Sequence, residues 1–311
     1  MGLEEGVVID MSLLEQWIGR EEVIEDTITA TPIRGMSATI DRGEANLEVG
    51  DPIPIPWHWL YFLPSPLASE LSDDGHPKRG GFLPPVPLPK RMWAGGSIEI
   101  IAAPKIGDWV KRVSTISDVT HKSGATGELV FVTVKHEIYA EGQLAITDRQ
   151  DLVYRESPTA DTPVAVPRPA PAGAMWSSKF EATPPLLFRY SALTFNSHRI
   201  HYDKDYTVNV EGYADLVVQG PLLATLLLDL LSRERPLSQL KRFDYRAVRP
   251  LLANNTFWVE GNVETDGGAE LNQAVSKSNR QLSDELVTSK LWVRDHANAI
   301  TMSATAFFVE N

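Results

Sequence analysis

The 311-residue chain contains no cysteine, and this absence removes several kinds of chemistry at once. Disulfides, thiolate nucleophiles and sulfur-ligated metal sites are excluded, so the fold must be stabilised by packing. The chain also lacks an excess of positive charge, because its formal net charge is −12 and its pI is near 5.1. Since binding to a nucleic acid requires a basic surface, we expect no nucleic-acid partner.

The sequence also has no apolar run long enough to cross a membrane. Its most apolar stretch, residues 216–231, is interrupted by Gln219, Gly220, Pro221 and Asp229, whereas a membrane span needs about 20 apolar residues. The first residues are acidic and lack the basic start and apolar core of a signal peptide. We therefore expect a cytoplasmic protein with no membrane partner.

Three common motifs are missing as well: the P-loop, the G-x-S-x-G nucleophile elbow and the G-x-G-x-x-G dinucleotide fingerprint. Nucleotide hydrolysis, serine hydrolase chemistry and dinucleotide-dependent redox chemistry therefore have no motif to carry them. Hydrophobic residues make up 43% of the chain, which is ample for a folded core. A lyase without a cofactor is compatible with all of these observations.

A proline-rich segment divides the chain near its middle. Residues 159–173 hold four prolines separated by alanine, valine and a few polar residues, which favours an extended connector without packing of its own. We therefore expect an N-terminal domain at residues 1–158, a linker at residues 159–173 and a C-terminal domain at residues 174–311.

The first half begins with a helix signal and ends in strands. Ser12, followed by Glu15, forms a capping-box pattern that predicts a helix over residues 12–18. Residues 80–93 are too rich in proline for regular structure, and they are either a strap over the core or a lid on a pocket. A proline-started apolar stretch is found at residues 56–63, and alternation predicts strands at residues 96–102, 109–119, 128–139 and 143–154.

The second half contains one strongly apolar helix followed by strands. Gly220 and Pro221 open a helix whose interior, residues 222–231, is apolar on nearly all sides and so must be enclosed by other elements. A curved antiparallel sheet around one buried helix satisfies both patterns and predicts an α+β fold. The predicted strands lie at residues 242–248, 255–263, 286–295 and 299–309.

Residues 189–203 concentrate polar side chains just before this helix. They include two histidines, an amide, two arginines and an aspartate. An imidazole exchanges protons near neutral pH, and a helix N-terminus offers unpaired N–H groups to a developing negative charge. Together these groups suggest proton abstraction beside a carbonyl. Gly220 is the candidate donor, because Pro221 has no N–H, although a tight entry turn would also explain the glycine.

The other polar side chains of this segment each allow two interpretations. Arg189 and Arg199 are candidates to hold a free carboxylate or the phosphates of coenzyme A, or they are solvated surface residues. His198 lies three residues before His201, but this pair suggests no third ligand, so we expect no metal. Asp203 is either a partner of His201 or the charge at a helix N-terminus.

Residues 196–203, followed by Gly220, resemble the motif of the MaoC-like R-specific enoyl-CoA hydratases, the hydratase 2 family with a hot-dog fold. The family pattern Asp-x-Asn-Pro-x-His-x-Asp aligns with this segment. In the alignment His201 matches the catalytic histidine, Asn196 stands at the position of the catalytic aspartate, and His198 replaces the asparagine. Because an amide has no proton to exchange, Asn196 would orient His201, a water or the substrate, unless it is only a turn residue.

Three segments resemble a fused branch of this family that contains mesaconyl-C4-CoA hydratases and 3-hydroxyacyl-thioester dehydratases. They are residues 57–64, 75–96 and 190–203. The resemblance implies a tandem (double) hot-dog fold in which each half is a curved antiparallel sheet wrapped around a central helix. It also implies that the first half is non-catalytic and that the halves pack as an internal pseudo-dimer. A homo-oligomer of this pseudo-dimer is compatible with the resemblance.

The resemblance further implies a reaction and a site. The expected reaction is the reversible hydration of an acyl-CoA thioester without a cofactor, with mesaconyl-C4-CoA giving citramalyl-CoA as the preferred case. A 3-hydroxyacyl-thioester dehydratase of fatty-acid synthesis and a non-catalytic acyl-thioester binder stay open. The expected catalytic residues are His201, Asn196 and Gly220, and the expected substrate-binding residues are His198, Arg199, Arg189, Gln219 and Asp203. Gln219 stands where many relatives have histidine.

Overall fold

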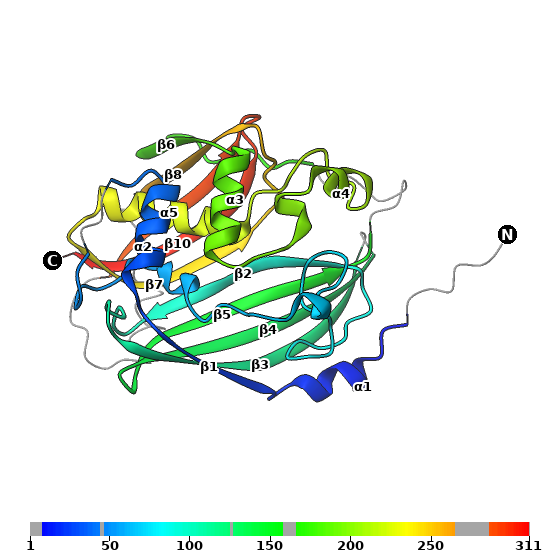
Figure 1. Ribbon diagram of the computed structural model, residues 1–311. Coiled ribbons are helices and arrows are strands. Elements are labelled where there is room, and N and C mark those ends of the chain that lie inside the picture. Colours follow the sequence, from blue (N-terminus) through cyan, green and yellow to red (C-terminus); the bar gives the residue numbers. More distant parts are fainter. Residues whose placement is uncertain (1–7, 44–46, 125–126, 158–165, 265–285, 311) are drawn as a thin grey trace.

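A computed structural model describes residues 8–43, 47–124, 127–157, 166–264 and 286–310. Its ten strands form one antiparallel sheet in the order β1-β3-β4-β5-β2-β7-β10-β9-β8-β6 (Figure 1). The order within the first half, β1-β3-β4-β5-β2, is matched by β6-β8-β9-β10-β7 in the second half. The two five-stranded units are joined where β2 pairs with β7. The sheet is therefore built from two copies of one topology, as the expected tandem arrangement requires.

Eight of the ten strands were predicted from alternation, with boundaries shifted by a few residues. The structure places them at β2 (Lys90–Ile100), β3 (Trp109–Gly124), β4 (Gly127–Ala140), β5 (Gln143–Arg155), β7 (Ser238–Ala247), β8 (Thr256–Glu264), β9 (Val287–Asp295) and β10 (Ile300–Glu310). The two that were missed are the outer strands β1 (Glu21–Thr27) and β6 (Trp176–Glu181). β1 carries four acidic residues, which hide its alternation from a hydrophobic pattern.

The longest helix, α5 (Gly220–Glu234), lies against the strands of the second half, and residues 222–231 of it are all buried. This confirms the predicted enclosed helix. The remaining helical elements are α1 (Met11–Leu14), η1 (Glu15–Trp17), α2 (Ala30–Thr39), η2 (Trp57–Leu60), η3 (Ala68–Glu70), α3 (Pro184–Leu193), η4 (Arg199–His201) and α4 (Lys204–Asn209). No helix in the described ranges is long and apolar enough to span a membrane.

Two local predictions are wrong. The first helix is capped by Asp10 and not by Ser12: the Asp10 carboxylate accepts from the Leu13 N–H (3.2 Å) and from the Ser12 hydroxyl (2.6 Å). An aspartate is as good an N-cap as a serine, and Asp10 lies two residues before Ser12. The proline-rich segment 80–93 is also less irregular than predicted, since β2 already begins at Lys90.

The described part of the predicted linker makes contacts with the second half. The Ala170 N–H donates to the Asn298 carbonyl (2.9 Å), and the Ile300 N–H donates to the Arg168 carbonyl (2.9 Å). Residues 166–173 are therefore held at the turn between β9 and β10, contrary to the expectation of an unpacked connector. The division of the chain into two domains at this linker stays a prediction.

The two halves differ at the position of the central helix. The element order β6-α3-α5-β7 in the second half corresponds to β1-α2-η2-β2 in the first half, and α2 and α3 pack side by side (Figure 1). Where the second half has the fifteen residues of α5, the first half has the four residues of η2. Pro56 before this turn and Pro64 after it prevent a longer helix. The first-half sheet is consequently not covered by an apolar helix of its own.

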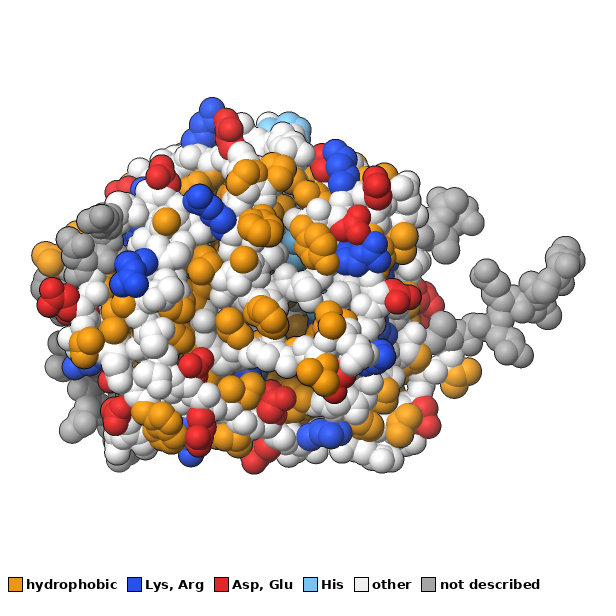
Figure 2. Space-filling view, in the orientation of Figure 1, with side chains coloured by type: hydrophobic (Ala, Val, Ile, Leu, Met, Phe, Trp, Pro, Cys, Tyr) orange, Lys and Arg blue, Asp and Glu red, His pale blue; other side chains and the backbone are white. Residues whose placement is uncertain are grey.

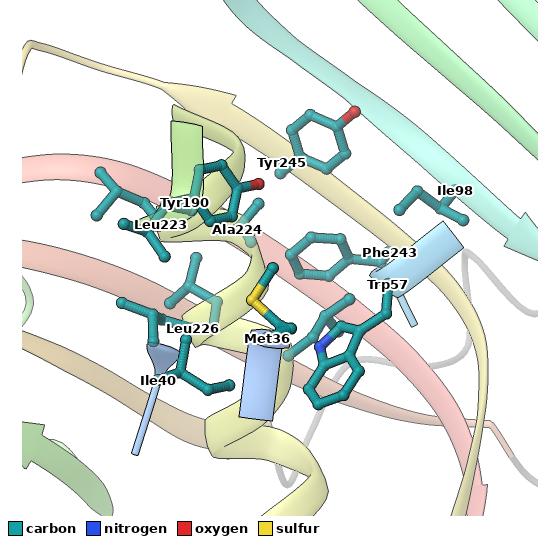
Figure 3. Packing of buried hydrophobic residues seen from close by; sticks show 14 of the residues in the cluster. Met36, Ile40, Trp57, Ile98, Tyr190, Leu223, Ala224, Leu226, Phe243 and Tyr245 are labelled. Carbon is teal, nitrogen blue, oxygen red and sulfur yellow. The ribbon is translucent and has the colours of Figure 1, made fainter. Parts of the chain in front are cut away.

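The largest hydrophobic cluster joins both halves around α5. Met36 and Trp57 from the first half pack with Leu226 and Phe243 from the second (Figure 3). We expect Leu226→Ala to lower the free energy of unfolding by about 2–5 kcal/mol, because its side chain is fully buried and its loss leaves a cavity. Urea unfolding measures this change. Leu67→Ala is the matched control: Leu67 is 67% exposed, so its loss should cost less than about 0.5 kcal/mol.

Candidate active site

A pocket of about 210 Å³ lies between the two halves of the chain. Asn196 and Pro221 line the pocket from the second half. The face of the molecule shown in Figure 2 has a small hollow near its centre, surrounded by hydrophobic side chains. Most of the polar lining of the pocket comes from the first half. These first-half residues are His58, Trp59, Trp93, Arg112, His136, Asp148 and Gln150.

His201, the predicted acid–base residue, is buried on η4 at the N-terminal end of α5. Its Nδ1 lies 2.7 Å from the Val217 carbonyl oxygen. Because a carbonyl can only accept, Nδ1 carries the proton and Nε2 keeps a free lone pair. Burial lowers the pKa of His201 to about 4, against the opposing effect of the Val217 carbonyl. The imidazole is therefore neutral at pH 7 and can accept a proton at Nε2.

The first residues of α5 present unpaired backbone donors. Among the described residues, neither the Gly220 N–H nor the Leu222 N–H has a hydrogen-bond partner. Pro221 lies between them and lines the pocket. A Cβ on Gly220 would lie 2.7 Å from the Trp93 ring, so close packing against Trp93 also requires glycine. The glycine thus permits a close approach and leaves a donor available at the pocket.

A row of imidazoles connects His201 to the first half. The His198 ring lies 5.4 Å from the His201 ring and 4.0 Å from the His76 ring, measured between centroids. The His76 Nδ1 lies 3.0 Å from the Asp74 carboxylate, so it donates to this acceptor. Burial lowers the pKa of His76 to about 4 and that of His198 to about 2. The row is therefore neutral at pH 7, with a carboxylate at its far end.

The loop that carries Asp74 and His76 is held directly against the predicted motif. The Arg199 N–H donates to the Asp74 carbonyl (2.9 Å), and the Ser197 hydroxyl donates to the Gly75 carbonyl (2.6 Å). Gly75 has a φ of +88°, and a Cβ there would lie 1.9 Å from the Ser197 carbonyl oxygen. Only glycine allows this contact. The first half therefore places Asp74 and His76 next to the segment that holds His201. We had expected no such contribution from a non-catalytic first half.

Asp74, His76 and His198 also lie close enough together to ligate a metal, with one ligand atom of each within 4.8 Å of the others. Two histidines and a carboxylate suit several divalent cations. However, the Asp74 carboxylate already accepts from His76, and the positive charges of Arg79 and Arg91 act on the His76 ring. These charges oppose a cation, and the absence of a metal stays a prediction.

Asn196 acts as the turn residue that the sequence allowed, and its role in orienting His201, a water or the substrate stays a prediction. It lines the pocket, and its side-chain oxygen accepts from the His198 N–H (3.0 Å). Its own N–H donates to the Ser191 carbonyl (2.8 Å), which holds the turn after α3. The side chain therefore fixes the backbone that carries His198 while it faces the pocket.

Arg199 and Asp203 form a local pair away from the pocket lining. Two nitrogens of Arg199 donate to one Asp203 carboxylate oxygen (3.0 and 2.7 Å), and the guanidinium stacks 4.0 Å from the Tyr206 ring centroid. Asp203 caps α4, since its carboxylate accepts from the Tyr206 N–H (3.0 Å). These contacts support the interpretation of Asp203 as the charge at a helix N-terminus. One face of the Arg199 guanidinium and its Nε–Nη2 edge are already engaged.

Arg189 and Gln219 also lie outside the pocket lining. Arg189 is on α3 and donates to the Ala38 carbonyl of α2 (3.3 Å). Gln219 is buried, and its amide donates to the Leu187 carbonyl and the Ser191 hydroxyl, both at 2.9 Å. These contacts connect helices to one another. The structure therefore does not bring these two predicted substrate-binding residues to the pocket.

Asp148, on β5, is a pocket residue that the sequence did not reveal. Its carboxylate accepts from the Trp59 indole (2.7 Å) and the Gln150 amide (2.9 Å), with His58 Nε2 at 3.4 Å. Burial opposes ionisation, but the hydrogen bonds from His58 and Trp59 hold the pKa of Asp148 below its usual value. Alternation could have placed Asp148 and Gln150 on one face of β5, although not against a pocket.

Comparisons with known proteins agree with this geometry. The family model of hydroxyacyl-thioester dehydratase type 2 matches residues 56–253. The chain is 44% identical over 238 residues to a mesaconyl-C(4)-CoA hydratase of Chloroflexus aurantiacus, covering 76% of this chain and 84% of that protein. It is 26% identical over 268 residues to a mitochondrial hydroxyacyl-thioester dehydratase type 2 of Schizosaccharomyces pombe, covering 75% and 87%.

A solved structure of a MaoC-like dehydratase matches the fold, with a TM-score of 0.67 and 12% identity over 96% of this chain and 100% of that chain. At this identity the match shows the fold alone, and it confirms the expected α+β hot-dog class. The family model covers more than half of the chain and includes Asp74, His76, His201 and Gly220. The chain belongs to the hydroxyacyl-thioester dehydratase type 2 family of hydro-lyases.

Proposed function

We propose that the protein hydrates the double bond of a short, branched dicarboxylic enoyl-CoA, with mesaconyl-C4-CoA giving citramalyl-CoA as the preferred substrate and product. One observation carries the chemistry: the Nδ1–H of His201 donates to the Val217 carbonyl near the start of α5, where the Gly220 N–H has no partner among the described residues. The 44% identity to a mesaconyl-C(4)-CoA hydratase supports the choice of substrate.

In the proposed reaction the thioester oxygen accepts hydrogen bonds from the Gly220 and Leu222 N–H groups, which stabilise the enolate. Nε2 of His201 takes a proton from water while the water oxygen bonds to the β-carbon. The same imidazole then gives this proton to the α-carbon, so the product gains one water and the ring returns to its neutral form. Because one group carries out both transfers of this proton, water adds to one face of the double bond.

The pocket size favours a short acyl group. A volume of about 210 Å³ corresponds to about seven water molecules at roughly 30 Å³ each. His201 is not itself part of the pocket lining, but Asn196 of the same motif and Pro221 of the α5 terminus are. The acyl end would therefore occupy the pocket, with the thioester at its second-half wall.

We expect the purified protein to remove the enoyl-thioester absorbance of mesaconyl-C4-CoA without added metal or cofactor, and to restore it from citramalyl-CoA. Pretreatment with a chelator should leave the rate unchanged. The proposal fails if neither this thioester nor crotonyl-CoA changes in absorbance with folded protein.

The second candidate is a dehydratase that acts on longer 3-hydroxyacyl thioesters. The Schizosaccharomyces pombe relative and the family model are both named as hydroxyacyl-thioester dehydratases, which supports the reaction class of this candidate. A rate that increases with chain length in a straight-chain 3-hydroxyacyl series would favour it. A cytoplasmic location and assembly of the pseudo-dimer into a homo-oligomer are further proposals, and size-exclusion chromatography with light scattering tests the second of them.

A further inference from the structure

Arg112 of β3 is a half-buried cation in the first-half wall of the pocket. Its side chain is 19% exposed, and its Nε is fully buried without a hydrogen-bond partner. Among the described residues its guanidinium makes no hydrogen bond at all. The nearest carboxylate is that of Glu22, whose oxygen lies 3.8 Å from Nη2, beyond hydrogen-bonding distance.

Leaving the buried Nε–H of Arg112 unpaired costs free energy unless an anion accepts a hydrogen bond from it. A guanidinium carries five N–H donors, and leaving buried donors unpaired loses their interactions with water. Arg294, at a comparable exposure of 21%, shows the usual solution: its Nε donates to the Glu260 carboxylate at 2.9 Å. Arg112 has no such acceptor, and its Cζ lies 5.4 Å from the Phe62 ring centroid instead.

Asp148 does not neutralise Arg112 by direct contact. Its carboxylate accepts from Trp59 and Gln150, as described above, and no contact joins it to the guanidinium within the described ranges. The attraction between Asp148 and Arg112 therefore acts only at a distance, and it opposes the larger effect of burial, which lowers the pKa of Arg112.

His136 lines the pocket beside Arg112 and can add a hydrogen bond. His136 on β4 bonds the Ser114 hydroxyl through Nδ1 (2.8 Å), which leaves Nε2 available. Burial lowers the pKa of His136 to about 4, so this ring brings no charge at pH 7. His58 lines the same pocket, with its Nε2 directed to the Asp148 carboxylate at 3.4 Å.

We propose that Arg112 binds the free carboxylate of a short dicarboxylic acyl thioester in a forked hydrogen bond. His136 and His58 stand beside this subsite. The second-half wall of the pocket holds Asn196 and Pro221, so the carboxylate would be bound at one wall and the thioester at the other. This inference rests on the proposed function and names the residue that selects its substrate class.

Binding of saturated analogues tests the inference without turnover. Methylsuccinyl-CoA carries the carboxylate, and isovaleryl-CoA has a methyl group in its place. With the full-length protein, titration calorimetry should show that Arg112→Met weakens binding of methylsuccinyl-CoA by about 10- to 100-fold, since hydrogen bonds to charged groups are lost. Binding of isovaleryl-CoA should change by less than about threefold.

Two further variants separate recognition from folding. Arg112→Lys keeps the charge but loses the fork, so it should weaken binding of the carboxylate analogue by an intermediate factor. Lys111→Met is the matched control, because the neighbouring strand position faces the other side of the sheet and packs on Tyr139 (5.2 Å). If Arg112→Met does not fold, as judged by circular dichroism, the Arg112→Lys titration decides.

The inference is overturned if the Arg112 variants weaken both analogues equally or leave methylsuccinyl-CoA unaffected. Failure of the proposed function looks different. In that case the wild-type protein would bind methylsuccinyl-CoA through Arg112 but would not hydrate mesaconyl-C4-CoA. Conversely, if the protein hydrates neutral enoyl-CoAs and the Arg112 variants bind methylsuccinyl-CoA as the wild type does, the protein is a lyase but Arg112 is not a carboxylate-binding residue.

Discussion

His201→Ala is expected to lower kcat for hydration of the enoyl thioester by about 10²- to 10⁴-fold, which is the usual contribution of a positioned general acid–base group. The expected loss is in kcat and not in KM alone, because Nε2 of His201 acts in the proton transfers, whereas other residues line the pocket. Steady-state rates from the enoyl-thioester absorbance, measured at saturating substrate, give both constants.

His296→Ala is the control, because His296 lies exposed in the turn between β9 and β10 and should have no effect on kcat. His201→Gln is a second test, since an amide can still donate to the Val217 carbonyl but cannot exchange a proton. Its kcat should be as low as that of His201→Ala, with unchanged thermal stability. A kcat equal to that of the wild type in both variants would show that another group carries the chemistry. If the wild-type protein and both variants bind the thioester equally well and none of them turns it over, the protein is a non-catalytic binder.

Part of this site could be predicted because its signals are local. α5 was predicted from an apolar run that begins with Gly220 and Pro221, and the segment that holds His201 was predicted from its resemblance to a family motif. The structure confirms the enclosed helix, and it places His201 at the helix terminus through the Val217 carbonyl. Both features depend on residues that are close together in the sequence.

The remaining parts of the site depend on contacts across the chain. Asp74 and His76 reach the motif only because Gly75 allows its loop to touch the Ser197 backbone. A glycine in a polar segment predicts a turn, but the sequence does not show which distant segment the turn contacts.

Arg112 could not be identified from the sequence for a similar reason. It lies in an alternating strand, and such strands usually expose their charged residues. The short η2 leaves part of the first-half sheet without a covering helix, and Arg112 lines the pocket beside η2. The sequence analysis instead selected Arg189 and Arg199, which lie near the motif in the chain but outside the pocket lining.

The free energy of unfolding is expected to fall steeply when the pH is lowered from about 6.5 to about 4. Burial lowers the pKa of His136 and of His201 to about 4 and that of His198 to about 2, whereas an unfolded histidine has a pKa of about 6.5. Below pH 6.5 the unfolded chain therefore binds protons that the folded chain does not. Each of these three rings should lower the stability by about 1.4 kcal/mol per pH unit, and above pH 6.5 the stability should be nearly constant.

Urea unfolding at pH 7.5, 6.5, 5.5 and 4.5 measures this slope, and the number of protons taken up follows from it. His76 should contribute less than the other rings, because its side chain is 18% exposed. Asp74 and Asp148 stay ionised throughout this range, since the pKa of each is held below its ordinary value. His136→Gln can keep the bond to Ser114 but not the titration, so it should reduce the slope by about one proton. A stability that is constant between pH 6.5 and 4.5, or an unchanged slope in His136→Gln, would mean that these imidazoles are accessible to water and not enclosed between the halves.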